Sequence, residues 1–282
     1  MRIANVDGRA SLVLGPSTVV DLAEASGGRF GSDIQPLYEN WHELRAFASA
    51  LDVSALSTRE VAAADFGNPV PAPRQVFAIG LNYAEHAAES AFAVPEHPPV
   101  FTKFVTSLTG PTGEITLPPG EVDWEVELVV VLGRAAHRVP AARAWEHIAG
   151  VTVGQDLSER VLQRVGPAPQ FSLAKSYPGF GPLGPVVVTP DELDDPDALE
   201  LGCLVNGEKV QEGSTKDMVF AVPELIEKLS AVTPLLPGDV IFTGTPAGVG
   251  LGRTPPRFLA AGDELVSYIT GVGEMRHLLV AP

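Results

Sequence analysis

From residue 75 onward the chain carries many short runs of β-favouring residues, and helical patterns interrupt them only twice. Pro, Gly and Asp turns separate these runs, which are QVFAIG, PVFTKF, VELVVVLG, GPVVV, LGCLVNG, DVIFTG and ELVSYI. The two helical patterns lie near residues 141–149 and 222–231. Because strands and helices do not alternate, a doubly wound sheet is disfavoured, and we expect an α+β, mainly β fold with a rolled or barrel-like core.

The first 70 residues predict a small α+β unit of their own. MRIANV, SLVLG and TVVDLAE predict short strands, with Asp7-Gly8 as a hairpin turn. Residues 36–51 predict a helix, because a proline suits its start and apolar residues recur at helical spacing after it. The segment DFGNPVPAPR, residues 65–74, is rich in proline and continues neither element type. We therefore predict a small domain, residues 1–70, and a larger domain, residues 71–282.

Acidic residues outnumber basic ones by 35 to 19, so the formal net charge is -16. This charge repels nucleic acid and anionic membranes over most of the surface, and neither is expected as a partner. A small anionic substrate would need local positive charge at its site, from a metal, Lys or Arg.

The remaining composition predicts a folded protein of a reducing compartment. Hydrophobic residues make up 45% of the chain, which excludes a disordered protein. Cys203 is the only cysteine, so an intrachain disulfide and a Cys-rich zinc site are excluded. Asp7 and Arg9 interrupt the amino-terminal segment before a signal-peptide core, and no apolar run approaches the roughly 18 residues of a membrane span. A cytoplasmic location is expected.

Two carboxylates accompany the apolar run VELVVVLG. Glu125 and Glu127 lie two apart, so on a strand their side chains share one face, and Asp123 extends the same spacing. Such crowding of negative charge is costly unless a cation neutralises it, and oxygen ligands suit Mg²⁺ or Mn²⁺. An edge strand with a solvated polar face is the commoner alternative for an isolated pair. Asp156 in VTVGQDLSER favours the metal site, because it is another acid closing an apolar strand.

A histidine and a glutamate lie three residues apart in GLNYAEHAAE, after a predicted strand end. On a short helix His86 and Glu89 share one face, so the carboxylate can orient the imidazole and raise its basicity. Such a histidine can take a proton from water or substrate near neutral pH. The alternative is an ordinary surface histidine.

Two lysines with apolar neighbours and one glycine-flanked threonine complete the candidates. Lys103 in PVFTKFVTSLTGP and Lys175 in FSLAKSYPGFGP can each supply positive charge to a carboxylate or a developing enolate. Either can instead snorkel from a strand with its ammonium in water. Thr245 in FTGTP offers a hydroxyl beside backbone amides suited to an anionic group, although alone this is only a turn.

Together these segments resemble the fumarylacetoacetate hydrolase family in content and in order. The matching pieces span roughly residues 75–275 and are GLNYAEHAAE, FTKFVTSLTGP, DWEVELVVVLG, GQDLSERVLQ, AKSYPGFGPLGP, LVNGEKVQEGSTKDMVF and PGDVIFTGTPAGVG. The resemblance implies a mixed β-roll core, a small amino-terminal domain, a homodimer and a Mg²⁺ or Mn²⁺ cofactor, with Ca²⁺ as a substitute in crystals. It points to the acylpyruvase-like or 2-hydroxyhepta-2,4-diene-1,7-dioate isomerase-like members.

The resemblance also implies roles for individual residues. It implies that the metal ligands are Glu125, Glu127 and Asp156 and that the water-activating pair is His86 and Glu89. The substrate-contacting lysine corresponds to Lys175. The further substrate contacts correspond to Arg160, Gln163 and Thr245, and we add Lys103 for its charge. One departure is Val161, since members commonly have an Asp after the Arg. If that Asp normally holds a basic residue, Arg160 or Lys175 is oriented differently here, which leaves the substrate class and the reaction type open.

The expected activity is metal-dependent hydrolysis of a C–C bond in a small 2-oxo acid or 1,3-diketo acid. Water activated by His86 would attack the distal carbonyl, and the leaving carbon would depart as an enolate stabilised by the metal and Lys175. The same site would serve oxaloacetate decarboxylation, or isomerisation or hydration of a hydroxydienedioate. A non-catalytic, metal-dependent 2-oxo-acid binding protein is the alternative of a different class, and the presence of both His86 and Glu89 argues against it.

Overall fold

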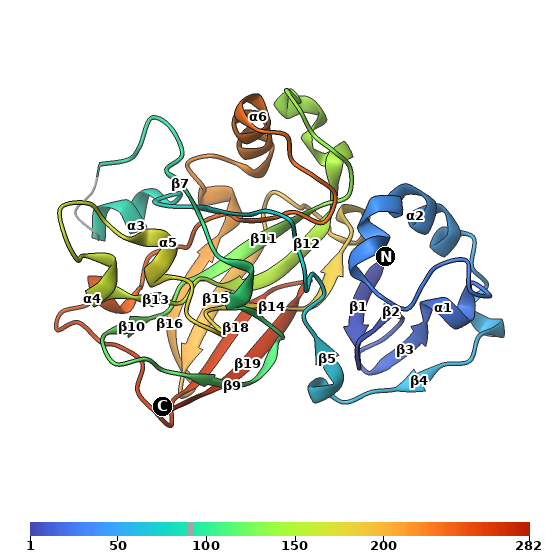
Figure 1. Ribbon diagram of the computed structural model, residues 1–282, viewed down its shortest axis with the longest axis horizontal. Coiled ribbons are helices and arrows are strands. Elements are labelled where there is room, and N and C mark those ends of the chain that lie inside the picture. Colours follow the sequence, from blue (N-terminus) through green and yellow to red (C-terminus); the bar gives the residue numbers. More distant parts are fainter. Residues whose placement is uncertain (90–92) are drawn as a thin grey trace.

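The computed structural model describes residues 1–89 and 93–282 and shows a mainly β protein with mixed sheets (Figure 1). In spatial order the large sheet contains β4 (Arg59–Glu60), β3 (Thr18–Asp21), β2 (Arg9–Val13), β1 (Arg2–Val6), β14 (Gly181–Val188), β12 (Ile148–Gln155), β11 (Val126–Leu132), β17 (Val240–Phe242), β6 (Val76–Ile79) and β7 (Val100–Thr102), with β5 (Phe66–Gly67) paired to β1 and β8 (Leu108–Thr109) to β14. The second sheet contains β16 (Glu208–Ser214), β15 (Glu200–Val205), β18 (Glu264–Ile269), β19 (Gly273–Val280) and β9 (Thr112–Thr116), while β10 (Val122–Asp123) pairs with β13 (Ser158–Glu159). Over the described residues neither strand order closes on itself, so the predicted α+β, mainly β class is confirmed as open sheets and not as a closed barrel.

The helices are short and lie between the strands. They are α1 (Leu22–Ala25), α2 (Trp41–Ser49), α3 (Ala84–Glu89), α4 (Arg160–Gln163), α5 (Phe171–Ala174) and α6 (Val222–Val232), with 3₁₀ turns at Gln35–Asn40, Val53–Ala55, Ala63–Asp65, Val105–Ser107, Ala141–His147, Pro190–Glu192, Thr215–Asp217 and Gly250–Gly252. Within the described ranges, no helix combines the length and the apolar character that crossing a membrane requires.

Two of the predicted helices differ from their expected form. The prediction near 222–231 is confirmed by α6, but 36–51 divides into a 3₁₀ turn and α2, which ends at Ser49. The segment 141–149 forms a 3₁₀ turn that stops at His147, because Ile148 already pairs with Leu132 of β11. Strand pairing across the chain therefore overrides the local helical spacing there.

The central strand β11 shows why the sequence pattern here is a continuous apolar run. Every one of its residues is buried, as expected when both faces of a strand are covered. Val126, Leu128 and Val130 join a core shared with the second sheet, whereas Val129 and Val131 join another core that includes α2. Because side chains alternate along a strand, Glu127, two positions before Val129, lies on the face turned away from the second sheet.

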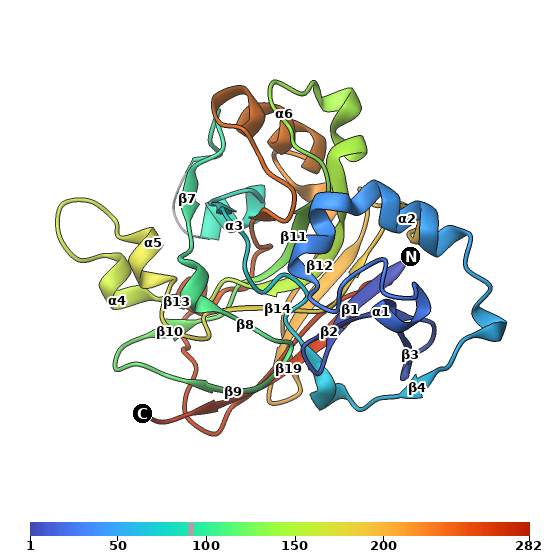
Figure 2. The ribbon, with the colours of Figure 1, turned by 45° about the vertical axis from the view of Figure 1, so that its right-hand side comes forward.

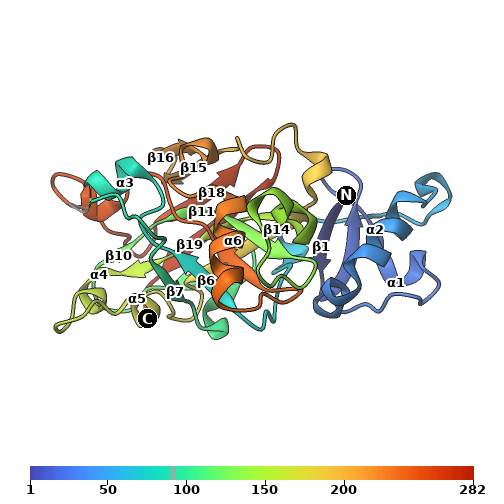
Figure 3. The same ribbon diagram turned by 90° about the horizontal axis from the view of Figure 1, so that it is seen from above.

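The amino-terminal strands extend the large sheet. β1 pairs antiparallel with β14, and Ile3 lies opposite Val187. Figures 1 and 3 place α1, α2 and β1 at one end of the molecule and α3, α4 and α5 at the other, and the rotated view in Figure 2 agrees. The division of the chain at residue 70 remains a prediction. The candidate residues carried by α3 and α4 lie at the end away from the amino-terminal strands.

Candidate metal and catalytic site

The three carboxylates predicted as metal ligands meet where β11 begins and β12 ends. Glu125 lies directly before β11, Glu127 is its second residue, and Asp156 follows β12. The antiparallel pairing sets Val126 opposite Gln155, so the start of β11 lies beside the end of β12. One oxygen from each carboxylate lies within 4.8 Å of the others, and all three side chains are buried. An oxygen set of this kind could hold a divalent metal ion.

Gly244 completes this face of the site. Its φ is 97°, and a Cβ at this position would approach the Cβ of Asn82 to 2.7 Å, so only glycine suits it. This backbone conformation lets the Gly244 N–H donate to Oε2 of Glu127 at 2.7 Å. Asn82 holds the opposing turn, because its amide donates to the carbonyls of Phe220 and Thr243. One backbone amide of the segment predicted to hold an anionic group thus binds Glu127.

Three basic side chains neutralise two of the carboxylates. Lys175 Nζ donates to Glu125 Oε2 and to Asp156 Oδ2, at 2.7 Å each. Arg160 Nη2 lies 2.7 Å from Glu125 Oε1. Lys103 Nζ donates to Asp156 Oδ1 at 2.7 Å and to the backbone carbonyl of Lys175. Every oxygen of Glu125 and of Asp156 therefore has a basic partner.

The carboxylates of Glu125 and Glu127 differ electrostatically. Burial raises the pKa of Glu127 well above its usual value, and the negative charges of Asp156 and Glu125 act in the same direction. Burial also favours a higher pKa for Glu125, but the charges of Lys175 and Arg160 outweigh it and lower that pKa to about 2. No salt bridge joins Glu127 to a basic residue in the described part of the chain. A bound cation would thus relieve the least compensated charge of the site.

Replacing Lys175 with methionine is expected to strengthen Mn²⁺ binding to the substrate-free protein. The ammonium lies 2.7 Å from oxygens of Glu125 and Asp156, so it competes with a metal ion for the same negative charge. We expect the affinity for Mn²⁺ to rise about tenfold. This corresponds to a fraction of the interaction energy of two unit charges 4 Å apart near a protein surface, which is roughly 4 kcal/mol. Isothermal titration calorimetry measures it, with exposed Lys209→Met as the control. Weaker binding by K175M would show that Lys175 supports the metal site.

His86 and Glu89 form the predicted pair on α3. Nδ1 of His86 lies 2.8 Å from Oε1 of Glu89. Oε2 of Glu89 accepts the N–H of Gly248 at 2.9 Å, which holds the carboxylate from the other side. Nε2 of His86 makes no hydrogen bond to a residue that the structure describes. His86 is close enough to Glu125 to contribute to the low pKa of that carboxylate, so the pair belongs to the surroundings of the cluster, where a proton acceptor is useful.

Two of the predicted substrate contacts make well-defined hydrogen bonds within the protein. Lys103 is 1% exposed and bonds to Asp156. The Thr245 hydroxyl donates to the carbonyl of Val126 and accepts from Gln211 Nε2, at 2.8 Å each. Both side chains therefore support the site from within, and their contact with substrate remains a prediction.

Arg160 finds partners despite the missing Asp at position 161. Val161 is 47% exposed. Arg160 Nε instead donates to Asp123 Oδ2 at 2.8 Å, and its Nη1 donates to Oε1 of Gln163 at 3.0 Å. Asp123, whose spacing extends the pair Glu125 and Glu127, thus takes part in the site through the arginine. An acid 37 positions away, Asp123, therefore holds Arg160 in this structure.

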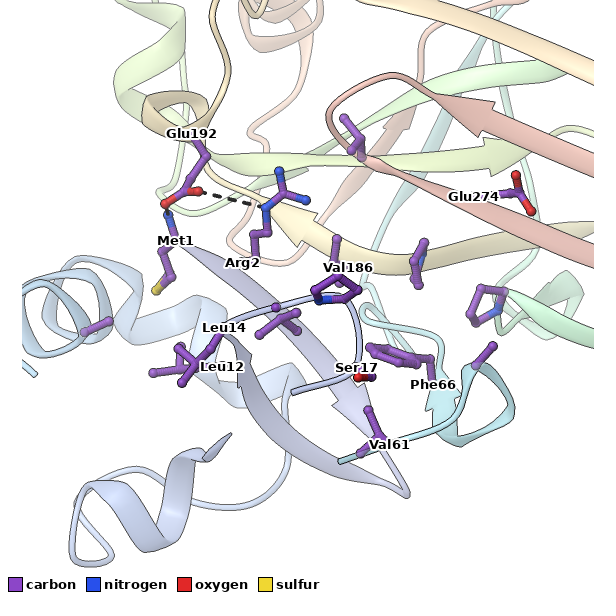
Figure 4. A pocket seen from close by; sticks show the side chains of 18 of the residues that line it. Met1, Arg2, Leu12, Leu14, Ser17, Val61, Phe66, Val186, Glu192 and Glu274 are labelled. Atoms are coloured by element: carbon purple, nitrogen blue, oxygen red, sulfur yellow. Dashed lines mark hydrogen bonds and ion pairs between the residues drawn. The ribbon is translucent and has the colours of Figure 1, made fainter. Parts of the chain in front are cut away.

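A cavity of about 880 Å³ lies elsewhere, beside β1, β2 and β14 (Figure 4). Leu12, Val61 and Phe66 contribute to its apolar lining. Among its charged residues, Glu192 lies against Arg2, with 3.9 Å between Oε2 and Nε. None of the predicted metal, catalytic or substrate-binding residues lines this cavity. This cavity is therefore separate from the candidate carboxylate cluster.

Comparison with known families agrees with the site. A model described as fumarylacetoacetate (FAA) hydrolase C-terminal matches residues 75–280. The chain belongs to the fumarylacetoacetate hydrolase family. The match includes the carboxylate cluster and α3, so the resemblance predicted from the motifs is confirmed. Members of the family are enzymes that act on small organic acids.

Three similar proteins illustrate the range of this fumarylacetoacetate hydrolase family. Human "Oxaloacetate tautomerase FAHD2A, mitochondrial" is 45% identical over 231 residues, which cover 81% of this chain and 72% of that protein. Maleylpyruvate hydrolase from Sphingobium sp. SYK-6, solved with manganese (II) ion and pyruvate, is 30% identical with a TM-score of 0.83, covering 100% of this chain and 99% of that one. A crystal structure of a Mycobacterium smegmatis protein is 58% identical with a TM-score of 0.95, covering 100% and 99% of the two chains.

Proposed function

We propose that this protein is a divalent-metal-dependent enzyme that converts small 2-oxo acids through an enolate, with tautomerisation of an oxaloacetate-type diacid as its main reaction. The observation that carries the proposal is the buried cluster of Glu125, Glu127 and Asp156, with the ammonium of Lys175 against it. The human relative named oxaloacetate tautomerase supports this choice of reaction. The C–C bond hydrolysis expected from the sequence becomes the second candidate.

The residues of the cluster fit Mg²⁺ or Mn²⁺. Three carboxylates supply hard oxygen ligands, and Glu127 is the one among them whose charge the surrounding protein compensates least. The manganese ion in the maleylpyruvate hydrolase structure supports this assignment. A divalent cation held by the three carboxylates would polarise the 2-oxo carbonyl and stabilise negative charge on its oxygen.

Lys175 and His86 share the proton and charge chemistry. Burial lowers the pKa of Lys175, but the carboxylates of Asp156 and Glu125 outweigh it and raise that pKa, so the ammonium stays charged. It would donate a hydrogen bond to the substrate oxygen on which negative charge develops. His86, held at Nδ1 by Glu89, would take the C3 proton at Nε2. The electrons of the C3–H bond then form the C2=C3 bond, and those of the C2=O π bond move to the oxygen. The oxygen gains a proton from solvent, and His86 returns its proton to solvent.

C–C bond hydrolysis is favoured by the same His86–Glu89 pair. His86 would remove a proton from water, the resulting hydroxide would attack the distal carbonyl, and the C–C bond would break toward an enolate beside Lys175. The maleylpyruvate hydrolase relative supports this candidate. A binding protein without catalysis would not need the histidine and glutamate. The homodimer and the cytoplasmic location remain predictions.

A substrate screen of the metal-loaded protein tests the proposal. Loss of enol-oxaloacetate is followed by absorbance, beside pyruvate release from acylpyruvates and isomerisation of hydroxydienedioates. We expect oxaloacetate tautomerisation to be fastest, to stop in excess chelator and to return with Mg²⁺ or Mn²⁺, because the cation stabilises the enolate charge. Full activity in chelator would contradict the carboxylate site. Binding of 2-oxo acids without turnover of any substrate would favour the non-catalytic alternative.

A further inference from the structure

Asp123 is a buried acid whose role the proposed mechanism leaves unassigned. Its side chain is 0% exposed, and hydrogen-bond donors from neighbouring residues reach both of its carboxylate oxygens. Oδ1 accepts the N–H of Gly250 at 2.6 Å and that of Trp124 at 2.8 Å. Oδ2 accepts the N–H of Leu251 at 3.0 Å and Nε of Arg160 at 2.8 Å. Asp123 therefore connects the backbone of the loop at Gly250 and Leu251 to the guanidinium of Arg160, which contacts the carboxylate cluster.

One side of this connection leads to the proposed metal ligands. Arg160 Nη2 lies 2.7 Å from Asp123 Oδ2 and 2.7 Å from Glu125 Oε1. The guanidinium thus bridges the two acids, and Gln163 holds a third nitrogen of it. A planar guanidinium with several directed hydrogen bonds has little freedom to turn. Asp123 thereby sets where the arginine's charge lies relative to Glu125.

The other side leads to the proposed base. Gly248, two residues before Gly250, donates its N–H to Glu89 Oε2 at 2.9 Å, and the other oxygen of Glu89 contacts His86. The loop also packs directly on this glutamate, because a Cβ at Gly252 would lie 2.9 Å from Glu89 Oε2. Asp123 holds Gly250, which lies between these two contact points. Movement of the loop would therefore release the carboxylate that orients His86.

We propose that Asp123 is a positioning residue that ties the loop 248–252 to Arg160 and so holds the His86–Glu89 pair in register with the carboxylate cluster. This inference rests on the proposed function for its kinetic part only. The link between Asp123 and the loop is a structural claim that needs no assumption about the substrate. A purely structural role for Asp123 would change stability without a selective effect on turnover or on the loop.

Asp123→Asn tests the proposal. The amide keeps the size of the side chain but loses the charge that holds Arg160, and it can no longer offer two acceptor oxygens to the loop. We expect kcat to fall about 10–100-fold, as for partners that orient functional groups, while KM changes by less than about threefold, as for an interaction made in the transition state. Hydrogen exchange measured by mass spectrometry should become faster in peptides that contain residues 248–252 and 84–89.

Asp239→Asn is the matched control. Asp239 is also fully buried and accepts backbone N–H groups, those of Gln75 and Leu236. Among the described residues, none of its hydrogen bonds reaches the loop 248–252. Its kcat and the exchange of residues 248–252 should match the wild type. Leu251→Pro is a second variant, since it removes one N–H donor to Asp123 and leaves the carboxylate in place. It should change kcat and loop exchange in the same direction as D123N and keeps the test decisive if D123N does not fold.

Each outcome decides the matter. Slower turnover together with faster exchange of the loop supports the proposal. Wild-type kcat in D123N, or slower turnover with unchanged exchange of residues 248–252, overturns it. If the wild-type protein turns over none of the screened substrates, the proposed function fails, and the exchange data alone then decide whether Asp123 holds the loop.

Discussion

A Glu127→Gln protein is expected to bind Mn²⁺ at least about 100-fold more weakly than the wild type, since even the outer partners of metal ligands contribute 10–100-fold. Glutamine keeps the size of the side chain and can still accept the N–H of Gly244, which lies 2.7 Å from Oε2 in the wild type. It loses the negative charge that a hard cation requires. Activity at low Mn²⁺ concentration should fall with the affinity.

The same substitution is expected to stabilise the metal-free protein at high pH. Burial and two neighbouring carboxylates raise the pKa of Glu127 in the folded protein, so the folded state binds this proton more tightly than the unfolded chain does. The stability of the metal-free wild type is therefore highest with Glu127 protonated and falls as the pH rises through the folded-state pKa. Glutamine has no proton to lose, so E127Q should not show this fall.

Calorimetric titration with Mn²⁺ and thermal unfolding in chelator, recorded across a pH series, measure both effects. Glu121→Gln is the control, because this acid pairs with Arg164 outside the cluster and is 40% exposed. It should bind Mn²⁺ like the wild type. Undiminished Mn²⁺ binding by E127Q would show that the ion binds through other ligands. A lower midpoint of unfolding for metal-free E127Q at high pH would contradict the assigned charge imbalance.

His86→Ala is expected to lower kcat for tautomerisation, and for hydrolysis if it occurs, by about 10²–10⁴, the usual contribution of a positioned acid or base. Both reactions need a proton acceptor, and Nε2 of His86 is the nitrogen that Glu89 leaves free. Mn²⁺ affinity should change little, because His86 is not one of the three clustered ligands. Where the wild type also decarboxylates oxaloacetate, the variant should keep most of that rate, since loss of CO₂ requires no proton acceptor and Lys175 would still stabilise the enolate.

Measuring tautomerisation, hydrolysis and decarboxylation in H86A distinguishes a role of His86 as the base from a role in supporting the carboxylate cluster. His42→Ala is the matched control, because His42 is exposed on α2, away from the cluster. Its rates should equal those of the wild type. Tautomerisation that persists undiminished without His86 would show that another group moves the C3 proton. Equal loss of all three reactions, decarboxylation included, would instead show that His86 supports the cluster itself.

Short-range patterns in the sequence were sufficient for many of the strands and for pairs of residues within one element. The apolar run that becomes β11 predicted a strand, and its period of two put Glu125 and Glu127 on one face. The spacing of three in α3 likewise predicted the contact between His86 and Glu89. These inferences hold because strand and helix geometry alone sets the direction of side chains two or three positions apart.

Local patterns were weaker where distant segments compete for the same residues. The helical spacing of residues 141–149 was overridden by pairing of β12 with β11, which gains hydrogen bonds and burial that the sequence window does not contain. Asn82 and Gly248 were missed as site residues because neither has a reactive group. Each acts through hydrogen bonds to segments more than a hundred positions away. A glycine or an asparagine in a turn gives no signal of such a partner.

The sequence by itself therefore determined the strand-rich class, the family and the candidate residues for the chemistry. The tertiary structure alone decided which of them meet. Lys175 bridges two carboxylates, and Lys103 bonds to Asp156 at a fully buried position. Asp123, which the spacing only placed on the same strand face as Glu125, holds Arg160. The physical reason is that an ion pair depends on the relative positions of separate chain segments. Packing of the sheets sets those positions, and spacing along the chain does not.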